Sequence, residues 1–251
     1  MLETRDLTIR FGGHVAVDHV SCAFAAGTLT AIVGPNGAGK TTYFNLISGQ
    51  LPASEGQVLL DGVDITRDSA PQRTKRGLGR AFQLTQLFPN LSVLENVRLA
   101  VQARHGGGLD LWRVWLDRRE WISEAQALLE QVRLQDKRDA PAASLPHGDQ
   151  RKLEVALLMA LDPKVYMFDE PTAGMSVDDV PVVLDLIRQL KRRKDCCILL
   201  VEHKMDVVRE LADRIVVLHN GQLVADGEPA AVIASPVVQQ AYLGVVAEDA
   251  S

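Results

Sequence analysis

The 251-residue sequence lacks the features of a membrane-spanning, secreted or broadly basic protein. Its longest uncharged stretch, residues 19–39, is interrupted by serine, glycine, proline and asparagine, so it cannot form a continuous lipid-facing helix. The first six residues show neither the basic start nor the apolar run of a signal peptide. The formal net charge of -5 argues against nucleic-acid binding through bulk positive charge. We therefore expect a cytoplasmic chain that binds no nucleic acid.

Cysteine is also scarce, and the three cysteines have no metal-ligand spacing. Cys196 and Cys197 open an apolar run, and Cys22 stands alone, so buried, reduced thiols are expected. Hydrophobic residues make up 47% of the chain and charged residues 24%, which is ordinary for a soluble globular protein. The chain is long enough for one large domain or two small ones, with a substantial core.

Short apolar runs bounded by turn residues recur along the chain and are typical of strands. They span residues 29–33, 58–60, 165–168, 196–201 and 215–218. Helical patterns lie between them, the clearest being an apolar stripe of Leu153, Ala156, Leu157, Ala160 and Leu161. This alternation predicts an α/β fold with a largely parallel sheet. Residues 84–143 have helical character without a strong strand, so we predict a helical subdomain there, inserted into a core of residues 1–83 and 144–251.

The segment from Gly34 to Thr41 matches the phosphate-binding pattern G-x-x-x-x-G-K-[ST] in full. It follows a strand pattern and precedes a helical one, which is the context that the motif requires. A glycine-rich turn with an exposed lysine is the ordinary alternative, and it would not need this context. Glycines let successive N–H groups turn inward around phosphate oxygens. Lys40 would bridge the β- and γ-phosphates, and the Thr41 hydroxyl would bind Mg²⁺. The predicted nucleotide contacts are Gly34, Pro35, Asn36, Gly37, Ala38, Gly39, Lys40, Thr41 and Thr42.

A second apolar strand pattern, residues 165–168, ends in two carboxylates. Asp169 at such a strand end can hold Mg²⁺ through water, beside a phosphate-binding loop. Glu170 then lies one step closer to the γ-phosphate, where it could polarise an attacking water. A solvated acidic turn is the ordinary alternative, and the complete phosphate-binding loop upstream favours the catalytic interpretation.

These motifs and several shorter ones, in the same order, make the chain resemble the ATP-binding subunits of ABC transporters. The resemblance covers nearly the whole sequence. It implies a P-loop ATPase core, an N-terminal antiparallel β subdomain and an inserted α-helical subdomain, with ATP and Mg²⁺ as ligands. The shorter motifs are the Q-loop at residues 81–83, the signature motif at 145–149, the D-loop at 173–176 and the switch histidine segment at 201–203.

The same resemblance assigns roles to four further residues. Gln83 would contact Mg²⁺ and the attacking water, and His203 would contact the γ-phosphate. Phe11 stands where an aromatic ring stacks on adenine, and Gly148 keeps an N–H in the signature motif. Taken alone, Gln83 would be a surface amide, Phe11 a core aromatic and His203 a strand-end histidine. The resemblance therefore implies Glu170, His203 and Gln83 as catalytic residues and Thr41, Gln83 and Asp169 around the metal.

Other short sequences resemble importers for branched-chain amino acids and their urea or short-amide relatives. They are residues 11–13, 80–83, 94–97, 153–154, 202–205 and 241–244. Such importers pair two different ATPase subunits with two membrane subunits and an external binding protein, and this chain resembles the longer ATPase. The implied partners are a second ATP-binding subunit, with a homodimer left open, transmembrane permease subunits and indirectly a solute-binding protein. The implied location is the cytoplasmic face of the cell membrane.

The signature motif departs from the family pattern. Pro146 replaces the usual serine and lacks both a hydroxyl and an N–H, and Asp149 replaces the usual glutamine and brings a carboxylate near a phosphate site. Ser176 stands where the D-loop often has Asp or Asn. Two alternatives stay open: a weakly hydrolysing ABC subunit that acts as an ATP-gated interaction partner, and a soluble ABC ATPase outside transport. Glu170 argues against the first, and the single cassette with a short insert argues against the second.

Overall fold

The computed structural model describes residues 1–81, 87–106 and 119–241. The chain forms two compact units. Unit 1 contains Met1–Leu78, Lys164–Glu170 and Lys191–Ser251, and unit 2 contains Gly79–Pro163 and Pro171–Leu190. The predicted helical insertion, residues 84–143, lies within unit 2. Unit 2 extends further than that prediction, because it also includes residues 79–83, 144–163 and 171–190.

An antiparallel sheet forms the N-terminal part of unit 1. Its strands are β1 (Leu2–Phe11), β2 (His14–Phe24), β4 (Glu55–Leu60) and β5 (Val63–Asp64), in the order β2-β1-β4-β5. Each neighbouring pair is antiparallel, and Phe11 lies opposite His14 at the tip of the first hairpin. This sheet is the antiparallel β subdomain that the family resemblance implies.

A second, mainly parallel sheet carries the loops of the candidate site. Strands β9 (Arg214–His219), β3 (Leu29–Val33), β8 (Cys197–Val201) and β7 (Val165–Asp169) lie side by side in that order and are parallel. Strand β10 (Gln222–Gly227) pairs antiparallel with the outer side of β9. All five residues of each of β3, β7 and β8 are buried, as the continuous apolar runs predict for strands covered on both faces. The α/β fold with a largely parallel sheet is confirmed.

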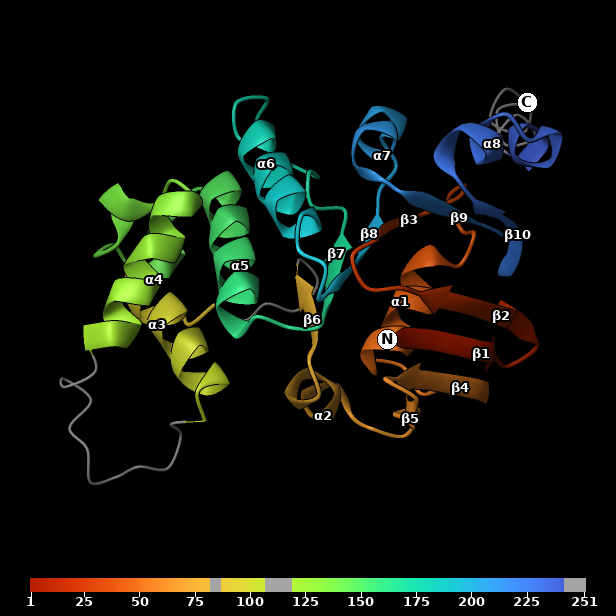
Figure 1. Ribbon diagram of the computed structural model, residues 1–251, viewed down its shortest axis with the longest axis horizontal. Helices are drawn as coiled ribbons and strands as arrows, with labels where there is room; N and C mark the ends of the chain where they lie inside the picture. The colour runs from red at the N-terminus through yellow and green to blue at the C-terminus, as the bar shows by residue number, and fades with distance from the viewer. Residues whose placement is uncertain (82–86, 107–118, 242–251) are drawn as a thin grey trace. The chain divides into compact units, whose positions relative to one another are not determined.

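One core connects the two sheets of unit 1 through α1 (Lys40–Ser48), which Figure 1 shows between them. Phe44 and Ile47 of α1 are fully buried, in a cluster with Val58 of β4 and Val216 of β9. The three cysteines are free and buried, as expected. Unit 1 also contains α2 (Ala70–Lys75), α7 (Met205–Leu211) and α8 (Pro229–Ile233).

The C-terminal end of α1 is held by a buried arginine. Arg73 of α2 is 2% exposed, and its guanidinium donates to four backbone carbonyls. Nη1 donates to Leu46 and Ile47 at 2.6 and 2.7 Å, Nη2 donates to Thr66 at 2.7 Å, and Nε donates to Asp68 at 3.0 Å. A cation at the carbonyl end of a helix is favourable because the helix dipole is negative there.

Unit 2 is mainly helical. Its chain enters through β6 (Leu78–Ala81), which begins at the boundary, and forms α3 (Val93–Arg104), α4 (Arg119–Gln131), α5 (His147–Leu161) and most of α6 (Val180–Lys191). Two short 3-10 helices, Gln135–Lys137 and Ala142–Ser144, precede α5. Helices α3, α4 and α5 pack against one another, as Figure 1 shows. The apolar stripe predicted over residues 153–161 lies in α5.

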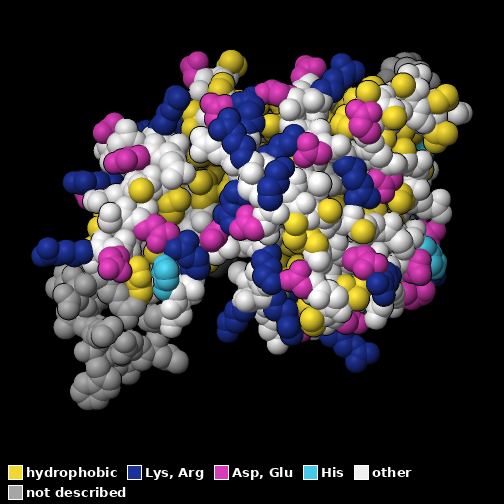
Figure 2. All heavy atoms as spheres, in the orientation of Figure 1, with side chains coloured by type: hydrophobic (Ala, Val, Ile, Leu, Met, Phe, Trp, Pro, Cys, Tyr) yellow, Lys and Arg dark blue, Asp and Glu magenta, His cyan; other side chains and the backbone are white. Residues whose placement is uncertain are grey.

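The surface carries charges of both signs. On the face in Figure 2, Lys and Arg side chains are interspersed with Asp and Glu. None of the helices in the described part of the chain combines the length and the hydropathy needed to cross a membrane.

Candidate functional site

The loop between β3 and α1 has a backbone that only glycine can adopt at two points. Gly34 has φ +151°, and a Cβ there would lie 2.1 Å from the carbonyl oxygen of Leu218. Gly39 has φ +95°, and its Cβ would lie 2.5 Å from the carbonyl oxygen of Ala16. Real Cβ atoms do not approach backbone this closely. The glycines of the motif are therefore required by the packing of the loop, besides allowing its N–H groups to converge on an anion.

Lys40 is the first residue of α1 and is 6% exposed. Its Nζ donates to the carbonyl oxygens of Gly34 at 2.7 Å and Pro35 at 2.8 Å, so the ammonium group lies under the curved loop. Burial lowers the pKa of Lys40, while the nearby carboxylates of Glu170 and Asp169 act in the opposite direction. A buried ammonium beside converging backbone N–H groups is suited to bind the phosphates of a nucleotide.

A hollow of about 370 Å³ over this loop brings together segments that are far apart in the sequence. Its walls come from the start of β2, the phosphate-binding loop, the start of α1 and the ends of two parallel strands. The lining residues are His14, Ala16, Asn36, Gly37, Ala38, Gly39, Lys40, Thr41, Thr42, Glu170 and His203. The opening lies at the carboxyl ends of the parallel strands, where ligands bind in open α/β sheets.

Glu170 and His203 form a hydrogen-bonded pair in this hollow. The Nε2 of His203 donates to Oε1 of Glu170 at 2.7 Å, and the two side chains are 40% and 41% exposed. Glu170 follows β7 with φ +49°, a left-handed conformation that costs about 1–3 kcal/mol and is concentrated at functional sites. Its own N–H donates to the Val201 carbonyl at 2.9 Å, which fixes it at the end of β8. The pair is open to solvent, so the carboxylate can accept a proton from a water.

Two oxygen groups of the site are suited to a small hard cation. Asp169 ends β7 and is 8% exposed, and Thr41 lines the hollow. No group of three or more His, Cys, Asp or Glu residues in the described ranges could hold a metal by itself. One carboxylate and one hydroxyl are nevertheless what Mg²⁺ needs when phosphate oxygens and waters supply the other ligands.

Four of the predicted contacts that the structure describes in unit 1 are not among the residues that line the hollow: Phe11, Gly34, Pro35 and Asp169. Phe11 is 50% exposed and does not line it, although its cross-strand partner His14 does. Gln83 lies outside the described residues. Sequence reasoning also missed Glu202, which is 3% exposed and accepts the N–H groups of His203 at 2.7 Å and Lys204 at 3.2 Å. Its position directly before His203 was the available signal, because an acidic residue there can order the turn that carries the histidine.

The predicted signature segment lies in unit 2, at the start of α5. Pro146 is the N-cap, with no side-chain hydrogen bond, and Gly148 lies in the first turn. Asp149 is 7% exposed, and its carboxylate is bound by the ammonium groups of Lys137 and Lys152. The sequence predicts a negative charge near a phosphate site at Asp149. In the structure two ammonium groups compensate that charge.

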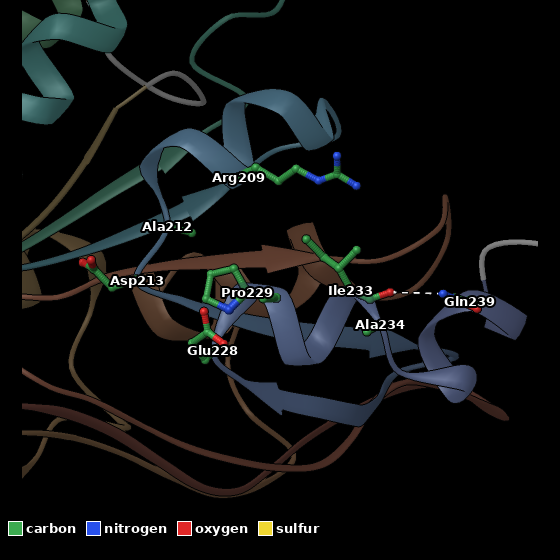
Figure 3. A pocket seen from close by; sticks show the side chains of 9 residues that line it. Arg209, Ala212, Asp213, Glu228, Pro229, Ile233, Ala234 and Gln239 are labelled. Carbon is green, nitrogen blue, oxygen red and sulfur yellow. Dashed lines mark hydrogen bonds between the residues drawn. The ribbon is translucent and has the colours of Figure 1, made fainter.

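A larger hollow, of about 720 Å³, lies elsewhere in unit 1 between α7 and α8. In Figure 3, Arg209 lies on one side of the hollow, and Glu228 and Pro229 lie across from it, below Arg209 in the view. The hollow shares no residue with the phosphate-binding loop. It lacks the glycine-rich backbone and the buried lysine, so volume alone does not identify the functional site.

A family model described as ABC transporter matches residues 17–173. The chain is 35% identical over 250 residues to the high-affinity branched-chain amino acid transport ATP-binding protein BraF of Pseudomonas aeruginosa, with 97% of this chain and 98% of that protein covered. It is 34% identical over 249 residues to LivG of Escherichia coli K12, a protein described in the same words, with the same coverage.

Solved structures that resemble this chain are also ATP-binding cassettes of ABC transporters. The ADP conformation of MJ1267, an ATP-binding cassette of an ABC transporter, matches with a TM-score of 0.81 and 31% identity, covering 97% of this chain and 98% of that one. A nucleotide-free ATP-binding cassette from an ABC transporter matches with a TM-score of 0.80 and 29% identity, covering 96% and 98%.

Proposed function

Because the chain belongs to the ABC transporter family, we propose that it is the ATP-hydrolysing subunit of an importer for branched-chain amino acids or related small polar solutes such as urea and short amides. The observation that carries the proposal is the hollow that joins the phosphate-binding loop to Glu170 and His203. The solute class is supported by 34–35% identity to two branched-chain amino acid transport ATP-binding proteins along 97% of the chain.

Nucleotide binding is assigned to the loop of residues 34–42. The backbone N–H groups and Lys40 would hold the phosphates, and Lys40 would exchange its bonds to the Gly34 and Pro35 carbonyls for charge-assisted bonds to phosphate oxygens. Thr41 and Asp169 would hold Mg²⁺, which neutralises phosphate charge when it is bound. Phe11 keeps its proposed role beside adenine, since an exposed aromatic ring at the hairpin tip is free to stack.

Hydrolysis is assigned to Glu170. Its carboxylate would accept the proton of the attacking water, and the hydrogen bond from His203 would hold it in place. Since Nε2 of His203 bonds Glu170 here, a contact between His203 and the γ-phosphate would use a rotated ring or a bifurcated bond. Gln83 retains its proposed role toward Mg²⁺ and water, at a position outside the described residues.

A second ATP-binding subunit is the proposed partner at the nucleotide. The start of α5 would present the Gly148 N–H and the positive end of the helix dipole to the nucleotide of that subunit. A heterodimer is the proposed arrangement, and a homodimer is the alternative. In either arrangement, each of two composite sites would combine the phosphate-binding loop of one subunit with the signature segment of the other. One site would use the loop of this chain, and the other would use its signature segment.

Permease subunits are the proposed partners of unit 2, at the cytoplasmic face of the membrane. Phe88 and Leu91 are 56% and 37% exposed, beside the segment that the resemblance calls the Q-loop. Asn96, 2% exposed, shapes their loop by accepting the Phe88 N–H at 2.8 Å and donating to the Phe88 and Ser92 carbonyls at 3.1 and 2.9 Å. Exposed apolar side chains on a fixed loop are suited to a protein contact.

Reconstituted transport tests the proposal. The chain, its second ATPase subunit and the permease would be placed in proteoliposomes with the binding protein, and ATP-driven uptake of labelled leucine, urea and a short amide would be compared. We expect uptake of one solute class, with loss of both uptake and phosphate release in Glu170→Gln. ATP hydrolysis by the assembled complex without uptake of any solute would favour an ABC ATPase outside transport. Uptake that survives Glu170→Gln would favour the weakly hydrolysing alternative.

A further inference from the structure

Lys152 of α5 carries a charge that is shielded from solvent. Its side chain is 8% exposed, and its Nζ contacts Oδ1 of Asp149 at 3.1 Å and Oδ1 of Asp179. A buried ammonium group is stable only with such partners, because it has lost its hydration. Asp149 lies in the first turn of α5, and Asp179 lies in the loop before α6. Lys152 therefore links two segments that are far apart in the sequence, with the rest of α5 and β7 between them.

Each carboxylate of this bridge has a second partner. Lys137 donates to Oδ2 of Asp149. The Ser176 hydroxyl donates to Oδ2 of Asp179 at 2.7 Å, and the Asp179 N–H donates back to that hydroxyl at 3.3 Å. Two ammonium groups and two carboxylates have formal charges that sum to zero. The carboxylate of Asp149 is thus compensated within unit 2.

The same segments approach each other closely at two glycines. A Cβ on Gly148 would lie 2.7 Å from Oδ2 of Asp179, so this carboxylate lies against the backbone of the signature segment. A Cβ on Gly174 would lie 3.3 Å from Nε2 of His147, and Gly174 has φ +70°. A side chain at position 148 would therefore collide with Asp179, and the backbone of Gly148 lies directly beside that carboxylate.

We propose that Lys152 is a positioning residue that fixes residues 146–149 against residues 174–179, so that the Gly148 N–H keeps the orientation needed to meet the nucleotide bound by the second subunit. This inference rests on the proposed function. It assigns Asp149 to the interior of the bridge and gives the phosphate contact to backbone N–H groups.

The contacts of the bridge favour the charged forms of Asp179 and Lys152. The hydrogen bond from Lys152, followed by that from Ser176, lowers the pKa of Asp179. Burial by itself would lower the pKa of Lys152, but the hydrogen bonds to Asp179 and Asp149 and the negative charges of these carboxylates together raise it.

Lys152→Met in the complete transporter tests the proposal, because it removes the ammonium group and keeps most of the stem. We expect kcat for ATP hydrolysis to fall by about 10- to 100-fold, since a misplacement of about 1 Å can cost about 10²-fold. Binding of labelled ATP to the purified chain should be unchanged, because that loop belongs to unit 1. Lys152→Arg should restore most of the activity. Lys164→Met, which removes a 57% exposed lysine paired with Asp61, is the matched control.

Asp179→Asn supplies a second variant if Lys152→Met does not fold. It removes one charge of the bridge and retains the size of the side chain, so it should lower kcat in the same direction. Wild-type kcat and KM in a folded Lys152→Met or Asp179→Asn complex would overturn the proposal, and so would a lower melting temperature with unchanged kinetics. If the wild-type chain does not bind labelled ATP, the proposed function itself is refuted. Failure of the positioning role and failure of the proposed function therefore give different results.

Discussion

Arg73→Met should be among the most destabilising single changes in unit 1. The variant keeps the apolar stem but removes the guanidinium that holds the carbonyls of Leu46, Ile47, Thr66 and Asp68. Two of these carbonyls belong to the last turn of α1, whose first residue is Lys40. The change therefore acts on the helix that carries the phosphate-binding lysine, from its opposite end.

The expected loss follows from the contacts. A hydrogen bond to a charged group contributes about 1.5–3 kcal/mol, so four would sum to about 6–12 kcal/mol. Removing a buried cation also removes its desolvation penalty of several kcal/mol, which offsets part of this sum. We expect the free energy of unfolding to fall by about 3–5 kcal/mol, which corresponds to about 6–20 °C in melting temperature for a chain of this size.

Thermal unfolding followed by circular dichroism would measure this loss, with Arg76→Met as the matched control. Arg76 lies three residues further on, and its side chain is 47% exposed and pairs with the Asp68 carboxylate at 2.6 Å. An exposed pair contributes about 0–1 kcal/mol, so the control should shift the midpoint by no more than about 4 °C. If Arg73→Met and Arg76→Met have the same melting temperature, the contacts of Arg73 with the carbonyls do not stabilise the fold as argued.

Lys40→Ala should weaken binding of labelled ATP by at least about 100-fold, because two charge-assisted bonds of about 1.5–3 kcal/mol each are lost; an unchanged titration would contradict this. Glu170→Gln should keep ATP affinity within about threefold and slow phosphate release by at least about 100-fold, and wild-type turnover would remove Glu170 from the base role. Asp149→Asn should lower the melting temperature by about 3–10 °C, because two ammonium groups lose a shared carboxylate. The control Asp139→Asn, with an 82% exposed side chain, should change it by less than about 2 °C.

The phosphate-binding loop and the parallel strands could be predicted because each is encoded by neighbouring residues. Five apolar runs became β3, β4, β7, β8 and β9, with ends that differ from the prediction by no more than three residues. The loop followed from eight consecutive residues whose chemistry is local. Glu170 followed from the carboxylates after a strand pattern, and His203 from the family resemblance. The structure adds that the two side chains bond each other across 33 positions.

The buried cations outside the motif could not be predicted in the same way. Arg73 binds carbonyl oxygens, which every residue has, so its partners leave no pattern in the side chains. Lys152 reaches Asp179, 27 positions later, through a contact that depends on the packing of α5 against the following loop. His14 was missed for a similar reason: it reaches the hollow as the cross-strand partner of Phe11, and the turn between them had to be placed first.

Pro146 and Asp149 therefore differ in what they change at the signature segment. Proline removes a hydroxyl that could reach a phosphate, and nothing in its place donates, since the N-cap has no side-chain hydrogen bond and its carbonyl accepts the Gln150 N–H at 3.0 Å. Aspartate adds a negative charge, but Lys137 and Lys152 compensate it. If ATP hydrolysis is slow at the composite site that this segment completes, the missing hydroxyl should therefore be the cause. The site on the present loop, which keeps Lys40, Glu170 and His203 together, should be the faster of the two.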